Sequence, residues 1–418
     1  MPNVNKRILS VPMVYTKKVT ESIKDDPEVI NLGRGESEFQ PPQLVRNALC
    51  RIVNEGEKWM KYGKTNGSKN LREAISRKYK REANLEIDPD WVLVTQGGTN
   101  ALYLAFLGIT NPGDEILIPD PCYVHYEPAI CHSLREIKGI RLPLPPENHF
   151  FPSSSLLDSY KNPQTKAFIM TSPLNPTGTI YNRSEIEEMV SWAKENDIFL
   201  IHDENHEKEC YDNNVHYPVS IFDHEFKNTI LINSFSRLGM GGWRLGWIVA
   251  NPKVIEAASM GLLYVNMSCN SFVQETGAYV LDHYDELGFS NYFNHYREKR
   301  DIMVKKLNCL NQVSCSLPQG TCYAFPNIRE LYNNNKEKIL YLVRKKIKNN
   351  STEEEKLWLE NSVSFAIHKF FLLFAKVGVI PGISYGKSGD DFVRMSFSVK
   401  QEEVVESMNR LEKIYDLL

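Results

Sequence analysis

Residues 229–251 read TILINSFSRLGMGGWRLGWIVAN, and this stretch decides the fold class. Its two ends, 229–235 and 245–251, are short apolar runs rich in β-branched residues, which is typical of buried strands. A glycine-rich segment with Arg237, Arg244 and no lysine joins them. Serine hydroxyls and a guanidinium together suit a phosphate. The stretch therefore predicts two strands connected by a binding segment.

Apolar bursts alternate with helical patterns on the N-terminal side of this stretch. The helical pattern SEIEEMVSWAKEN (184–196), with Ser184 as its expected N-cap, lies between two of the bursts. Strands that alternate with helices predict an α/β fold with a mostly parallel sheet and right-handed crossovers. The further strand candidates are 90–96, 114–120, 167–173 and 198–204.

The pattern changes after about residue 290. Residues 292–310 predict one long amphipathic helix, and short strand-like pieces at 321–328 and 391–399 precede a final helix. The polar, charge-rich segment 333–362 is interpreted as a surface excursion. We expect three parts: 1–44 as an N-terminal arm that joins the small domain, 45–290 as the large domain, and 291–418 as a smaller α+β domain.

Composition excludes several classes of protein. The chain has 418 residues, 42% of them hydrophobic, and a net charge of −3, so neither nucleic acid nor an anionic membrane is expected as a partner. No apolar run reaches the roughly 18 residues of a membrane span, and no signal-peptide pattern opens the chain. The 8 cysteines are scattered without a C-x-x-C pair. We expect a cytoplasmic protein with reduced thiols and no metal site.

Small and amide side chains follow two of the predicted strands. Gly98 and Thr99 come after 90–96, where glycine lets a ligand approach the backbone and a helix N-terminus favours phosphate. A tight strand-to-helix turn explains them equally well. Asn175 stands before a proline, which holds it extended, so its amide could point into a cleft or belong to a polar turn.

Charged and aromatic side chains mark further strand ends. Asp203 requires a cationic partner there, either a protonated pyridine nitrogen or an arginine. His206 is a ligand-facing donor or a surface histidine, and Tyr123 stacks on a flat ring or fills the core. Arg394 lies in an apolar strand, where it would bind a carboxylate ligand or form a structural salt bridge.

The order and spacing of these residues resemble those of the class I/II aminotransferases, which are fold-type I enzymes that use pyridoxal 5′-phosphate (PLP). The resemblance runs from about Ile30 to Phe397. It includes INLGRGESEFQPP (30–42), KYGKTNGSKNLREAI (61–75), PQGTCYAFP (318–326) and GVIPGISYG (378–386). It implies a large domain with a mostly parallel seven-stranded sheet flanked by helices, beside a smaller α+β domain.

The resemblance also implies residue roles. Tyr123 would stack on the PLP ring, Asn175 would donate to its phenolic oxygen, and the catalytic residue Asp203 would pair with its pyridine nitrogen. Tyr62 would reach the phosphate in the neighbouring subunit of a homodimer. The other implied cofactor-binding residues are Gly98, Thr99, His206, Ser234 and Arg244, and the implied substrate-binding residues are Gly35, Asn175 and Arg394.

Two positions depart from the family pattern. His206 stands where the family usually has tyrosine, and a histidine titrates near neutrality. The family's Schiff-base lysine is absent, but one lysine inserted between Ser236 and Arg237 brings Ser234 and Arg244 into register together. Either a cofactor-modified lysine was omitted from the sequence as written, or the gene lacks it, or Arg237 replaces it together with a deletion. Omission is the simplest explanation, because one event repairs both spacings.

The resemblance implies an aminotransferase that moves an amino group from an L-amino acid to a 2-oxo acid through a lysine aldimine, in amino acid metabolism or biosynthesis. The same scaffold also carries β-lyases, synthases, decarboxylases and oxygen-using enzymes, so these remain alternatives. A catalytically silent relative is the alternative if the lysine is truly absent. The sequence does not identify the amino donor.

Overall fold

The computed structural model describes residues 4, 19, 23, 26–132, 136–347 and 352–418. Its centre is a seven-stranded sheet with the order β2-β8-β7-β6-β5-β3-β4. β8 is antiparallel to both β2 and β7, and every other neighbouring pair is parallel. This confirms the predicted fold class. The strands are β2 (Val92–Thr95), β3 (Glu115–Asp120), β4 (Lys138–Pro143), β5 (Thr165–Thr171), β6 (Phe199–Asp203), β7 (Thr229–Ser234) and β8 (Gly246–Val249).

The sequence analysis identified every strand of this sheet except β4. β4 lies at the edge of the sheet and pairs only with β3. Of its six residues only Leu142 is buried, and Lys138 and Arg141 interrupt its apolar character. The apolar run that marks a central strand is therefore missing from β4, and no burial signal was available to predict it.

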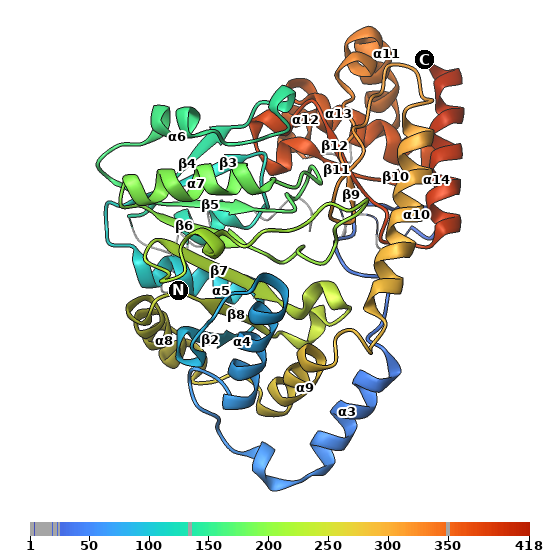
Figure 1. The fold of residues 1–418 in the computed structure, drawn as a ribbon. Helices are drawn as coiled ribbons and strands as arrows, with labels where there is room; N and C mark the ends of the chain where they lie inside the picture. The colour runs from blue at the N-terminus through green and yellow to red at the C-terminus, as the bar shows by residue number, and fades with distance from the viewer. Residues whose placement is uncertain (1–3, 5–18, 20–22, 24–25, 133–135, 348–351) are drawn as a thin grey trace.

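Helices cover both faces of the sheet (Figure 1). Side chains alternate along each strand, so Ile201 faces a core layer that includes α5 (Gly98–Ile109) and α8 (Pro252–Asn266). Leu200 faces the opposite layer, to which α4 (Lys69–Ala83) and α7 (Arg183–Glu195) contribute. Consecutive residues at the end of β6 therefore reach different environments. The remaining helices of the large domain are α3 (Gln43–Asn54), α6 (Ser154–Tyr160) and α9 (Ser271–Asp282).

The N-cap predicted for α7 is wrong. The helix begins at Arg183, and its N-cap is Asn182 rather than Ser184. The Asn182 side chain accepts from the Glu185 backbone N–H, and the Glu185 carboxylate accepts in return from the Asn182 backbone N–H. This reciprocal capping box satisfies two backbone donors, which a cap at Ser184 could not do.

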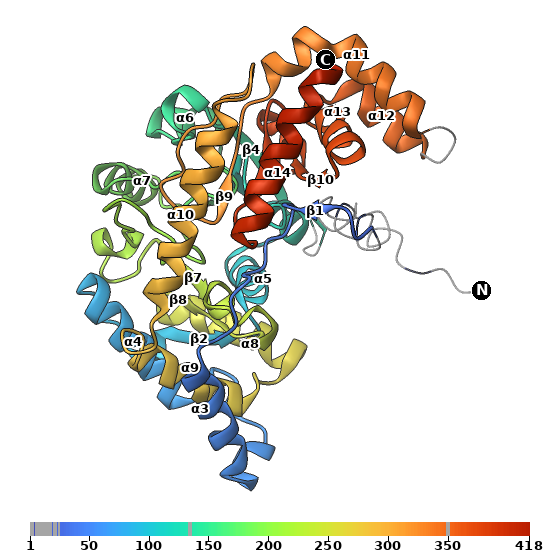
Figure 2. The same ribbon diagram turned by 90° about the vertical axis from the view of Figure 1, so that its right-hand side faces the viewer.

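A smaller unit packs beside the large sheet. In Figures 1 and 2 the long helix α10 (Phe289–Leu307) runs alongside α14 (Gln401–Lys413). A three-stranded sheet has the order β11-β12-β9, and β1 pairs in parallel with β10. The elements are β1 (Ile30–Asn31), β9 (Tyr323–Ala324), β10 (Val377–Gly378), β11 (Ile380–Pro381), β12 (Val393–Ser396), α11 (Arg329–Ile347), α12 (Glu353–Asn361) and α13 (Val363–Phe370).

The polar segment 333–362, interpreted above as a surface excursion, is mostly helical. Most of it lies in α11 and α12, and α11 packs against α13 through buried Ile339 and Val343. Its charged residues occupy the solvent-exposed face of these helices, so the composition alone did not indicate that the segment is helical. Within the predicted N-terminal arm, residues 1–3, 5–18, 20–22 and 24–25 lie outside the described residues.

Two expectations from composition can be compared with the structure. The seven cysteines whose side chains are described are all free thiols, as expected. Among the described helices, none is both long enough and apolar enough to cross a membrane.

Candidate active site

One pocket gathers most of the residues singled out in the sequence. It lies at the carboxyl ends of the parallel strands, where open α/β sheets bind ligands. Gly35, Tyr62 and Arg394 do not line it, whereas the other predicted cofactor and substrate residues do. The predicted residues that line the pocket are Gly98, Thr99, Tyr123, Asn175, Asp203, His206, Ser234 and Arg244.

Asp203 is a nearly buried carboxylate in this pocket. Its Oδ2 accepts from the Tyr126 hydroxyl at 2.8 Å. Its Oδ1 accepts from the Asn205 backbone N–H at 3.1 Å and from the Asn205 side-chain amide at 2.6 Å. Among the described residues no lysine, arginine or histidine forms an ion pair with it. A buried carboxylate of this kind suits a cationic partner, and a protonated pyridine nitrogen in the pocket would supply one.

The opposite end of the pocket offers donors for an anion. The N-cap of α5 is Gly97, with φ of +82°, so the first N–H groups of the helix open toward the pocket. The Arg244 guanidinium lies against this turn and donates to the carbonyls of Gly241 and Gln96. Ser234 and Ser236 bring hydroxyls to the same pocket. Donors of this kind suit a phosphate.

Asn205 is a pocket residue whose role the sequence analysis did not assign. Its side-chain amide donates to Asp203, and its Oδ1 accepts from the Ser234 hydroxyl at 2.5 Å. It therefore connects the carboxylate to the serine. Its position two residues after Asp203 was the only available signal, and residue spacing could not show that its side chain would turn back on Asp203.

His206 is buried, and its Nδ1 contacts Glu209 Oε2 at 2.5 Å. Burial, reinforced by the charge of Arg237, lowers the pKa of His206 from its ordinary value. The pKa of His206 therefore lies below that of an ordinary histidine, which titrates near neutrality. Its ring packs edge-on against Tyr323, with centroids 5.8 Å apart.

Arg394 lies just outside the pocket lining and contacts Asn175 of the pocket. Its Nη1 donates to Asn175 Oδ1 at 3.3 Å, and its Nη2 donates to the Gly33 carbonyl at 3.1 Å. Its guanidinium stacks on Tyr323 at 3.9 Å. Nε has no hydrogen-bond partner in the described part of the chain. No carboxylate there pairs with Arg394, so the structural salt bridge considered as an alternative is not formed.

Gly35 and Tyr62 lie apart from the pocket lining. The Gly35 carbonyl accepts a hydrogen bond from Arg237. Tyr62 is 85% exposed on the segment between the short helix Glu57–Met60 and α4. It makes no contribution to the pocket of its own chain.

Arg237 occupies the pocket position next to Ser236. Its guanidinium donates to the Gly35 carbonyl at 2.5 Å and to the Tyr323 hydroxyl at 3.1 Å. No lysine lines the pocket among the residues that the structure describes. A guanidinium stays protonated and cannot serve as the amine nucleophile. The pocket therefore fits the ring and phosphate of PLP, but the chain as written lacks the group that would bond to it covalently.

Comparisons with known proteins agree with this geometry. Residues 27–411 match the family model described as aminotransferase class I and II. An aspartate aminotransferase from Pyrococcus horikoshii is 32% identical over 412 residues, which is 98% of this chain and 96% of that protein. Aromatic-amino-acid aminotransferase 2 from Thermococcus litoralis is 29% identical over 92% of this chain and 91% of that protein. The crystal structure of an aromatic aminotransferase from Pyrococcus horikoshii superposes with a TM-score of 0.80 at 29% identity, covering 96% of this chain and all of that one.

Proposed function

The chain belongs to the aminotransferase class I and II family, and we propose that its pocket holds PLP and transfers the amino group of an L-amino acid to a 2-oxo acid. The observation that carries the proposal is Asp203, a buried carboxylate with three hydrogen-bond donors around it and no cationic partner among the described residues. When bound, PLP supplies an electron sink for a carbanion at the substrate α-carbon.

The chain's own residues have separate tasks in this proposal. Asp203 holds a proton on the pyridine nitrogen, because a negative charge beside that nitrogen raises its pKa. Tyr123 stacks on the ring, and Asn175 donates to its phenolic oxygen. Arg394 binds the substrate carboxylate, for which its bidentate guanidinium and its free Nε are suited. The remaining proposed contacts to the phosphate come from Gly98, Thr99, Ser234 and Arg244.

We further propose that the functional polypeptide carries a lysine between Ser236 and Arg237. This lysine would move the proton between the substrate α-carbon and the cofactor as general base and acid. Peptide mapping of the native protein tests the proposal directly. A peptide heavier than SFSR by one lysine, with or without PLP, supports it, and an unmodified SFSR junction contradicts it.

Two variants test the register independently if the native junction proves to be SFSR. Insertion of a lysine after Ser236 places Arg244 eight positions after the amine, whereas Arg237→Lys places it seven positions after the amine. We expect activity only from the insertion, because only it satisfies both spacings. Activity from Arg237→Lys alone would contradict the register argument and would favour replacement with a deletion.

The reaction class is tested with substrates. The relatives are named for aspartate and for aromatic amino acids, so we propose that the amino donor is an acidic or aromatic L-amino acid. Transamination requires a 2-oxo acid acceptor, whereas a lyase releases ammonia without one. Product formed only when the acceptor is present supports the proposal. A borohydride-resistant chromophore with no turnover of any donor would favour the silent relative.

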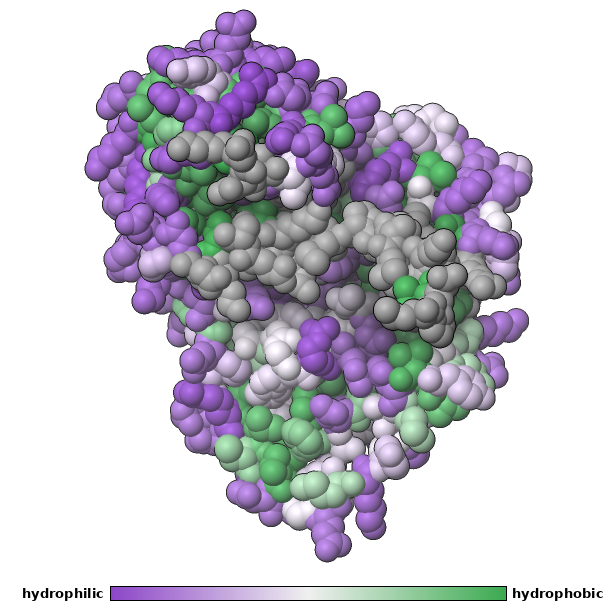
Figure 3. Space-filling view, turned by 180° about the vertical axis from the view of Figure 1, so that it is seen from behind, coloured by the Kyte–Doolittle hydropathy of each residue, from purple (hydrophilic) through white to green (hydrophobic). Residues whose placement is uncertain are grey.

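A homodimer is part of the proposal. Tyr62 is exposed and does not line the pocket of its own chain, which supports a role for it at the phosphate of another copy. Figure 3 shows apolar groups gathered on the lower part of the molecule, over the large domain. Large exposed side chains of that domain include Met60, Tyr62, Tyr264, Val265 and Met267. Light scattering tests this assembly, and a monodisperse monomer with full activity would refute it.

The free thiols agree with a cytoplasmic location, which is also proposed.

A further inference from the structure

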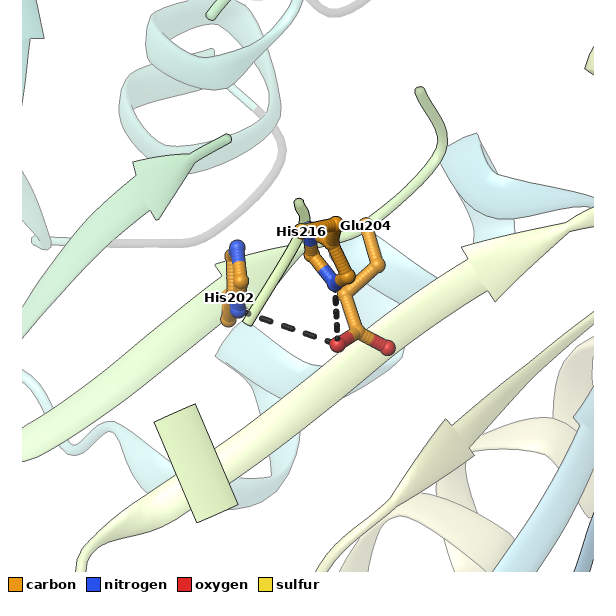
Figure 4. Close-up of side chains that lie close together, drawn as sticks. All are labelled: His202, Glu204 and His216. Carbon is orange, nitrogen blue, oxygen red and sulfur yellow. Dashed lines mark hydrogen bonds and ion pairs between the residues drawn. The ribbon is translucent and has the colours of Figure 1, made fainter. Parts of the chain in front are cut away.

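A second group of ionisable side chains lies on the other face of β6. Side chains alternate along the strand, so His202 and Glu204 point away from the side to which Asp203 points. His216, from the loop that follows, completes the group (Figure 4). His202 and Glu204 are fully buried, and the His216 side chain is 7% exposed. None of the three lines the proposed PLP pocket.

Both ring nitrogens of His216 face oxygen atoms that accept hydrogen bonds. One ring nitrogen, Nδ1, lies 2.8 Å from the Ser172 carbonyl, which can only accept. The other, Nε2, lies 3.0 Å from Glu204 Oε1, which also accepts when the carboxylate is ionised. A neutral imidazole has one N–H and cannot satisfy both oxygens. The contact with Glu204 therefore requires a further proton, on either side chain, or a metal ion bound to both atoms.

Neighbouring side chains hold the Glu204 carboxylate in the orientation that a metal ligand would have. Glu204 Oε2 accepts from the Tyr79 hydroxyl, which itself accepts from the Trp247 indole N–H. Oε1 is thereby left to face the histidines. Hydrogen bonds from the outer atoms of ligating histidines and carboxylates to neighbouring groups are characteristic of metal sites.

His202 adds an unpartnered side chain. Neither of its ring nitrogens has a hydrogen-bond partner among the described residues, and Nδ1 lies 3.8 Å from Glu204 Oε1. The nearby cation Lys78 is already matched, because it forms ion pairs with Glu82 and Glu207. A buried imidazole without a partner, directed at a carboxylate and a second imidazole, is the feature that a metal ion would explain.

We propose that His202, Glu204 and His216 bind a divalent transition-metal ion of the zinc class. The ligand atoms lie within 4.8 Å of one another, whereas ligands on a tetrahedral zinc ion lie about 3.4 Å apart, given bonds of about 2.0–2.2 Å. His216 Nε2 and Glu204 Oε1, at 3.0 Å, are slightly closer than this. Binding of an ion would require the two histidine side chains to rotate toward Glu204. Two imidazoles and one carboxylate are a known ligand set for zinc.

The loop that carries His216 borders the molecular surface. Residues on either side of His216, among them Asn214, Val215 and Tyr217, line an open cleft on the surface. A bound ion would tie this loop to the strand that carries Asp203. The proposal does not depend on PLP binding or on the reaction catalysed.

The experiment uses the full-length protein after treatment with a chelator. We expect one equivalent of Zn²⁺ to bind in competition with a chromophoric chelator and to raise Tm. Co²⁺ in its place should give the visible spectrum of nitrogen and oxygen ligation. His202→Asn and His216→Gln should each weaken Zn²⁺ binding at least tenfold. His283→Gln is the matched control, because it removes an exposed histidine that also faces a glutamate, Glu286, and it should bind as the wild type does.

Several results would overturn the proposal. One is the absence of Zn²⁺ binding to the wild type. Another is a Co²⁺ spectrum of thiolate ligation, since free cysteines are present. Unchanged affinity in both folded histidine variants would equally reject the site. If the variants fail to fold, the wild-type stoichiometry and spectrum still decide.

Discussion

The charge of Asp203 can be removed with little change in its shape, by Asp203→Asn. The asparagine oxygen can keep both hydrogen bonds from Asn205, while its amide donates to the Tyr126 hydroxyl, which can accept as well as donate. The variant should therefore fold, and its Tm should stay close to that of the wild type. What disappears is the carboxylate that pairs with the pyridine nitrogen.

The size of the effect follows from the burial of this carboxylate. Removing one partner of a buried ion pair costs about 3–5 kcal/mol, and each 1.36 kcal/mol corresponds to a factor of ten in rate. For the lysine-containing polypeptide we expect kcat/KM to fall by roughly 10²- to 10⁴-fold. Asp203→Ala should remain folded and bind PLP weakly, with activity nearly abolished.

The assay is steady-state transamination with saturating PLP, together with a thermal melt of each variant. Tyr126→Phe is the matched control, because it removes one hydrogen bond to Asp203 and keeps the charge. Its kcat/KM should fall less, by about 10- to 100-fold. If Asp203→Asn is folded, saturated with PLP and within tenfold of wild-type turnover, the role assigned to Asp203 is wrong.

Three further changes test other parts of the structure. Gly97→Ala should weaken PLP binding at least tenfold in a spectroscopic titration, because its Cβ would lie 2.7 Å from Arg244 Nη2. Gly113→Ala is the control: Gly113 has a similarly positive φ of +96° but open space around it, so this variant should leave PLP binding unchanged. Arg244→Gln should raise the Kd for PLP by about 10- to 100-fold through loss of a charged hydrogen bond to phosphate, in the same titration. Burial lowers the pKa of His368 to about 3, below its unfolded value of about 6.5, so this group costs stability as pH falls below 6.5, roughly 2 kcal/mol by pH 5. His368→Gln should therefore lose less stability than the wild type between pH 7 and pH 5 in denaturant melts, and the exposed His283→Gln should behave as the wild type.

The sheet was largely predictable because its central strands are buried on both faces. Continuous apolar runs such as β5 and β7 follow directly from that burial. β4 was not predicted because an edge strand can contain charged residues, here Lys138 and Arg141. The cap of α7 was placed two residues late because Asn182 and Ser184 are both good capping residues, and only the reciprocal contact with Glu185 distinguishes them.

The candidate site was predictable where a residue follows a strand end, since parallel strands bring their ends to one edge. Asn175, Asp203 and Ser234 meet in the pocket for that reason. Side-chain direction was not predictable. The return of Asn205 onto Asp203 and the meeting of His202 with His216 depend on packing between layers. The spacing of residues along the chain does not indicate that packing.

The missing lysine after Ser236 affects catalysis but not the residues proposed to bind the cofactor. Ser234 and Arg244 both reach the pocket although the chain between them is one residue shorter than the family pattern requires. The two short helices Phe235–Leu238 and Gly241–Trp243 lie in this segment, and Gly239 and Arg244 both adopt positive φ. Because the proposed phosphate donors line one pocket without the lysine, reversible PLP binding alone would be no evidence for a transaminase. A covalent link does provide that evidence. Yellow colour that borohydride bleaches, with the reduced cofactor still attached after denaturation, requires an amine in the pocket. Cofactor lost on gel filtration under denaturing conditions after the same treatment is what the chain as written would give.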